Sequence, residues 1–239
     1  MPDSNISLTG HETLGPVWGN QGDLLRLHTT VGDLTCLFRQ APGARAAVLW
    51  AGSLAGEGPT LRANPIPQAL STDLVKEGIA SLLLRYRETH DLGPCIQDTR
   101  AALAFLEGQG FRRIALVGHS FSGAVVISVA PLSQAVTAVV TLASQTYGAR
   151  RADLVSPRPL LLVHGMSDQT LNPYCSEQIY SWAKHPKRLV LLEGAGHGLR
   201  ERLNELLPIL RAWLAEKLTA TDEVAVEGSA PKAGSVTEP

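Results

Sequence analysis

The chain has 239 residues, of which 44% are hydrophobic, and this length and composition suit a single large α/β domain with a substantial core. The formal net charge of −1 excludes a bulk electrostatic attraction to nucleic acid or to an anionic membrane surface. The three cysteines lie far apart with no CxxC pair, which excludes a disulfide framework and a zinc signature and favours reduced thiols in the cytoplasm.

The N-terminal part of the chain predicts a leader followed by a hairpin. Residues 1–23 are rich in Gly, Asn, Pro and Thr, contain no apolar run of the kind found in a secretory signal, and predict an irregular leader. Residues 24–28 and 34–39 are short, partly alternating runs separated by a turn at Gly32-Asp33. They predict an antiparallel hairpin at one edge of a sheet.

Strands and helices alternate through the rest of the chain. Continuous apolar runs predict buried strands at residues 46–50, 80–85, 114–117, 135–143 and 160–163, and residues 188–192 predict the last strand. Helical spacing, or in one case a mostly apolar segment, predicts helices over residues 65–79, 94–109, 124–130, 174–184 and 199–218. The alternation implies crossover connections, and therefore an α/β fold with a doubly wound, mostly parallel sheet and helices on both faces.

Residues 24–218 make up this single domain. After Leu218 the composition changes to Ala, Gly, Ser, Thr, Pro and acidic residues, so residues 219–239 predict a disordered tail. No apolar run in the chain approaches the roughly 20 residues that a membrane-spanning helix needs.

The stretch from Ile114 to Gly123 carries the first chemical signal. A short buried strand ends in small residues, and a mostly apolar segment follows, so Ser120 lies at a sharp strand-to-helix turn. The N–H groups at a helix N-terminus favour developing negative charge there. Gly118-His119-Ser120 followed by Gly123 resembles the nucleophile elbow of the α/β-hydrolase family. The usual G-x-S-x-G pattern has glycine where this chain has Ser122, a residue small enough for the close approach.

Two further polar residues follow strands later in the chain. Asp168 comes after the strand at 160–163, and His197 after the strand at 188–192. The carboxyl ends of parallel strands converge on one face, where ligands bind. Attack by a hydroxyl on a carbonyl needs a base, and the base needs an orienting carboxylate. The order Ser, Asp, His is that of the α/β hydrolases, and the loops around Asp168 and His197 resemble the acid and histidine loops of that family.

The resemblance implies Ser120 as nucleophile, His197 as general base and Asp168 as orienting acid. It also nominates two backbone N–H groups for the oxyanion hole, those of Ser53 and Phe121. Ser53 belongs to a loop of small residues after the strand at 46–50, and an ordinary glycine turn is the alternative interpretation of that loop.

Too few residues separate Gly148 from Pro157 to build a sizeable helical lid. The compact, lidless pattern resembles the dienelactone-hydrolase-like and small carboxylesterase branch. It implies hydrolysis of a small-molecule ester or thioester through an acyl-enzyme, with no metal and no organic cofactor. The oligomeric state is left open.

Three other interpretations stay open. The same triad serves acyl transfer or cofactor-free perhydrolysis, a non-catalytic binding protein can reuse the fold, and some peptidases share it. Other polar residues have simpler explanations. We expect His119 and His164 to be structural, Ser122 to face the helix, and Cys175 to be a buried, inert thiol. The charged side chains that follow the strand at 80–85 could line the site but are expected at the surface: Arg85, Arg87, Glu88 and His90.

Overall fold

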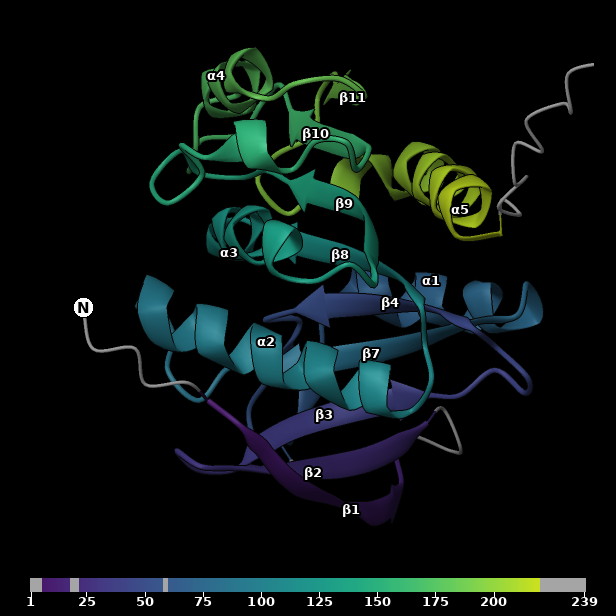
Figure 1. The fold of residues 1–239 in the computed structure, drawn as a ribbon. Coiled ribbons are helices and arrows are strands. Elements are labelled where there is room, and N and C mark those ends of the chain that lie inside the picture. The colour runs from purple at the N-terminus through teal and green to yellow at the C-terminus, as the bar shows by residue number, and fades with distance from the viewer. Residues whose placement is uncertain (1–5, 18–21, 58–59, 220–239) are drawn as a thin grey trace, which may run out of the picture.

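The computed structural model describes residues 6–17, 22–57 and 60–219, and Figure 1 shows their arrangement. Within these residues, nine strands form one sheet. In spatial order they are β1 (Leu8–Pro16), β2 (Asp23–Thr29), β3 (Leu34–Arg39), β7 (Ile79–Arg85), β4 (Ala46–Ala51), β8 (Arg113–His119), β9 (Val136–Leu142), β10 (Leu160–Gly165) and β11 (Lys187–Leu192). The helices are α1 (Pro65–Lys76), α2 (Leu92–Gly108), α3 (Phe121–Val129), α4 (Tyr174–Trp182) and α5 (Leu203–Thr219). A separate two-stranded ribbon joins β5 (Leu54–Ala55) to β6 (Arg62–Ala63).

The sheet is parallel from β7 to β11 and antiparallel from β1 to β7. From β4 the chain crosses to β7 on one side, and from β7 it returns to β8 on the other side of β4. The strand order therefore reverses between β4 and β8. In open α/β sheets a crevice forms at such a point, outside the carboxyl ends of the strands.

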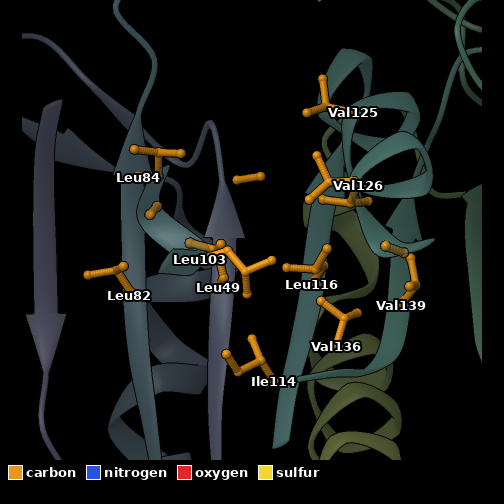
Figure 2. Packing of buried hydrophobic residues seen from close by; sticks show 14 of the residues in the cluster. Leu49, Leu82, Leu84, Leu103, Ile114, Leu116, Val125, Val126, Val136 and Val139 are labelled. Atoms are coloured by element: carbon orange, nitrogen blue, oxygen red, sulfur yellow. The ribbon is translucent and has the colours of Figure 1, made fainter. Parts of the chain in front are cut away.

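Side chains of the central strands alternate between two cores. In β4, Ala47 and Leu49 belong to one buried cluster, whereas Val48 and Trp50 belong to the other. Helices α2 and α3 cover the first cluster, and α1 and α5 cover the second (Figure 1). Figure 2 shows the first cluster from close by, with Leu49 of β4 beside Leu103 of α2. Two covered faces explain why these strands are apolar throughout rather than alternating.

The predicted doubly wound α/β fold is confirmed, but the leader is partly wrong. Residues 8–16 of the predicted irregular leader form β1, the edge strand, which pairs antiparallel with β2. An edge strand has one partner and most of β1 is exposed, so its side chains stay polar and show little apolar alternation. Residues 1–5 and 18–21 of the predicted leader and residues 220–239 of the predicted tail lie outside the described residues.

Candidate active site

Ser120 occupies a strained turn between β8 and α3. Its φ is 56° and its ψ −120°, a region that residues other than glycine rarely adopt. The turn is tight because the start of α3 folds back over β8. A Cβ on Gly118 would lie 2.1 Å from the Ser122 carbonyl oxygen, and one on Gly123 would lie 2.3 Å from Ser144 Oγ. The packing thus requires glycine at both positions and tolerates Ser122, which is buried. The Ser122 Oγ lies against the loop after β4, where a Cβ on Gly52 would be 2.5 Å away.

Asp168 lies in the turn after β10, and its side chain is fully buried. Its Oδ1 accepts the backbone N–H groups of Thr170 (2.7 Å) and Leu171 (2.9 Å), while Oδ2 accepts Nδ1–H of His197 at 2.8 Å. Burial alone would raise the pKa of Asp168, but the hydrogen bonds from the two backbone groups and from His197 outweigh it and hold the pKa below its ordinary value. The carboxylate therefore stays ionised beside the imidazole.

His197 lies in the loop after β11 and keeps 23% of its side chain exposed. Because its Nδ1–H is donated to Asp168, Nε2 is left as the nitrogen that can take a proton. The backbone of His197 is held by His119, whose Nε2–H donates to the His197 carbonyl oxygen at 2.8 Å. His119 directly precedes Ser120, so this bond ties the histidine loop to the elbow.

The two histidine rings lie close together, with centroids 4.8 Å apart. Burial lowers the pKa of His119, so this ring adds no positive charge next to His197 at neutral pH. Among the hydrogen bonds of the described residues, none joins the Ser120 hydroxyl directly to His197. In enzymes without bound substrate such catalytic contacts are often long, and they tighten when substrate binds.

Comparisons with known proteins address the fold. No protein-family model matches the chain. The uncharacterized Escherichia coli protein YfhR is 51% identical over 43 residues, which cover 18% of this chain and only 15% of YfhR. The structure aligns with Est1E from Butyrivibrio proteoclasticus, with a TM-score of 0.70, 15% identity, and coverage of 82% of this chain and 98% of Est1E.

Two further solved structures align over most of their length. One is a serine hydrolase without a lid from Xanthomonas campestris, with a TM-score of 0.68, 18% identity, and coverage of 86% of this chain and 99% of that one. The other is a dienelactone hydrolase from Anabaena variabilis, with a TM-score of 0.66, 21% identity, and coverage of 81% and 96%. The chain has the α/β-hydrolase fold. The lidless and dienelactone-hydrolase-like neighbours agree with the branch that the sequence resembles.

In this α/β-hydrolase fold, one of the two predicted oxyanion donors is wrong. The N–H of Ser53 donates to the carbonyl oxygen of Leu84 in β7 at 2.9 Å, because the loop after β4 folds against the neighbouring strand. That group is already used within the protein. Phe121 is the first residue of α3, so its N–H has no acceptor within the helix and remains a candidate donor.

The loop after β7 is fixed to α2 at one residue and reaches the nucleophile elbow at another. Arg87 donates from Nε to Oδ1 of the fully buried Asp98 at 2.8 Å, which fixes this loop to α2. His90, with a φ of 76°, lies edge-on to Phe121 at 6.3 Å between ring centroids. Cys175 is half-buried at the start of α4, so the prediction of a buried thiol there is wrong.

Sequence reasoning missed the contacts of His164. Its ring lies fully buried between Asp168 and Ser176, and it is hydrogen-bonded to both. Its place at the end of a strand, four residues before the acid, was the available signal. Over the part of the chain that the structure describes, no group of three or more His, Cys, Asp or Glu side chains could hold a metal ion.

Proposed function

We propose that this protein is a serine hydrolase that cleaves a small carboxylic ester or thioester through an acyl-enzyme. The observation that carries the proposal is the strained backbone of Ser120, together with the hydrogen-bonded pair of Asp168 and His197. All three residues follow the carboxyl ends of parallel strands. A binding protein on this fold has no need of a positive φ at a serine or of an ionised carboxylate buried against an imidazole.

In the proposed mechanism, His197 acts first as a base and then as an acid in each half-reaction. His197 Nε2 takes the proton of the Ser120 hydroxyl as Oγ attacks the carbonyl carbon. The resulting oxyanion is stabilised by the Phe121 N–H at the positive end of α3. Asp168 keeps the His197 proton on Nδ1 and stabilises the imidazolium that forms. The imidazolium then protonates the leaving alcohol or thiol. In the second half-reaction His197 deprotonates a water molecule that attacks the acyl carbon, the bond to Ser120 Oγ breaks, and the imidazolium returns the proton to Oγ as the acid leaves.

One feature of the described chain favours a short acyl group. Between β9 and β10 the described chain forms only a short 3-10 turn, Ala152–Leu154, so this connection contributes no helical lid.

The proposal is tested with p-nitrophenyl esters of graded acyl length on the wild type and on Ser120→Ala. We expect turnover of the acetate and butyrate esters, loss of turnover on long-chain esters, and no turnover by Ser120→Ala. The matched control is Ser122→Ala, which removes a buried hydroxyl two residues away and should retain most of the activity. Equal turnover by the wild type and Ser120→Ala would remove Ser120 as the nucleophile.

We also propose that the enzyme is located in the cytoplasm. All three cysteines are free thiols, as expected in a reducing compartment. No helix in the described part of the chain combines the length and apolar character needed to cross a membrane. Fractionation of cells that express the full chain, followed by blotting, tests this placement.

A further inference from the structure

His164 is a buried titratable residue that the proposed mechanism does not use. It is the second-last residue of β10, four residues before Asp168, and both side chains are fully buried. Its Nε2 lies 3.1 Å from Asp168 Oδ2, the oxygen that also accepts Nδ1–H of His197. A single carboxylate oxygen thus faces two imidazole rings, one half-buried in the site and one enclosed in the core.

The surroundings of His164 decide which ring nitrogen carries the proton. Nε2 faces two acceptors, the Asp168 carboxylate and the Leu171 carbonyl oxygen at 3.0 Å, so Nε2 must be the donor. Nδ1 lies 2.7 Å from Oγ of the buried Ser176, whose hydroxyl can donate to it. Both nitrogens then have a partner, and no hydrogen-bonding group of the ring is left unsatisfied.

The Asp168 carboxylate is consequently held by four protein donors. Two backbone N–H groups fix Oδ1, and the two imidazoles share Oδ2. The torsion that orients a carboxylate is soft, so a group held only from the Oδ1 side could rotate with His197. The N–H donor of His164 prevents this rotation, because it holds Oδ2 in the position where it accepts Nδ1–H of His197.

We propose that His164 is a positioning residue, which orients the Asp168 carboxylate toward His197 by donating Nε2–H to Oδ2. This inference rests on the proposed hydrolase function for its effect on rate. His164 touches neither substrate nor reacting atoms, and it acts only through Asp168. A hydrogen bond to a charged group is worth the equivalent of about tenfold to a hundredfold in rate, so we expect its loss to lower activity within that range.

Two substitutions separate hydrogen bonding from packing. His164→Gln keeps an N–H donor near the position of Nε2, and its amide has two protons for the two acceptors there. His164→Leu fills a similar volume without any donor. We expect kcat for p-nitrophenyl acetate to fall at least about tenfold in His164→Leu with KM nearly unchanged, and His164→Gln to recover most of the loss. The matched control, Ser176→Ala, removes only the Nδ1 partner and should change kcat much less.

A spectroscopic readout makes the test independent of turnover. In the wild type with ¹⁵N-labelled histidine, the His164 ring should carry its proton on Nε2 and none on Nδ1. The downfield proton of the His197–Asp168 hydrogen bond should be displaced in His164→Leu and kept in His164→Gln. A wild-type His164 protonated on Nδ1 alone would overturn the inference, even if His164→Leu does not fold. Equal kcat values for the Leu and Gln variants would also overturn it.

The two proposals fail in different ways. Absence of esterase activity in the wild type would contradict the hydrolase function, while the tautomer and the His197 resonance would still decide the role of His164. An active wild type whose His164→Leu variant keeps full kcat and an undisplaced resonance would remove the positioning role and leave the hydrolase intact.

Discussion

Replacing Asp168 by asparagine disturbs the site in a way that the hydrogen bonds dictate. Oδ1 accepts hydrogen bonds from two backbone N–H groups, which can only donate, so the amide oxygen of the asparagine must take that place. The NH₂ group then occupies the Oδ2 position and points a donor at Nδ1 of His197, 2.8 Å away in the wild type. His197 avoids the donor–donor contact only by moving its proton to Nε2.

With the proton on Nε2, His197 cannot act as the base for Ser120. Trapping a catalytic histidine in this tautomer lowers kcat by ~10⁴-fold, which corresponds to about 5.5 kcal/mol of barrier. The buried NH₂ also faces Nε2–H of His164, and one unsatisfied buried polar group costs about 1–3 kcal/mol of stability. We therefore expect a folded but less stable protein with almost no turnover.

The assay is steady-state hydrolysis of p-nitrophenyl acetate, with thermal unfolding followed by circular dichroism. The control is Asp73→Asn, which removes an exposed carboxylate paired with Lys76 on α1 and should leave both kcat and stability nearly unchanged. An Asp168→Asn variant that keeps kcat within about tenfold of the wild type would refute the reasoning about the tautomer.

Three further outcomes are expected from particular contacts. In native protein a thiol reagent should react with the half-buried Cys175 and not with the buried Cys36 and Cys95. Burial raises the pKa of both buried thiols, to about 12 for Cys95, so little reactive thiolate forms; after unfolding all three cysteines should react. Because the pKa of Asp168 is lowered by folding, its carboxylate stabilises the protein above the ordinary value of 3.8, and this contribution is lost as the pH falls through the folded-state pKa. Denaturant unfolding at pH 7 and pH 3 should therefore show a smaller gap between wild type and Asp168→Asn at the lower pH. Gly118→Ala places a Cβ 2.1 Å from a backbone oxygen and should cost about 3 kcal/mol or more, whereas Gly108→Ala, with no heavy atom within 4 Å of its new Cβ, should be neutral or stabilising in the same unfolding assay.

The core of the fold could be predicted from the sequence because the signals there are local. Strands such as β4 are buried on both faces, so they are apolar throughout, and the elbow needs small residues at fixed positions. The acid and the histidine each follow a parallel strand, and they meet because the carboxyl ends of parallel strands lie on the same side of the sheet.

The remaining features depend on contacts between distant segments. The N–H of Ser53 is taken by Leu84 of another strand, and nothing in the loop sequence shows that pairing. The edge strand β1 is held by backbone hydrogen bonds to β2, which polar side chains do not reveal. The role of His164 needs the tautomer, and the tautomer is set by Asp168, Leu171 and Ser176 only once the chain has folded.

Covalent labelling tests the central claim most directly. The protein is treated with a fluorophosphonate probe, and the adduct is located by intact-mass measurement and peptide mapping. An activated Ser120 predicts one adduct per chain, on Ser120, with none on Ser120→Ala and greatly slowed labelling of His197→Ala. A wild type that stays unmodified, or that is labelled at another residue at the same rate in all three proteins, would contradict the claim that His197 activates Ser120.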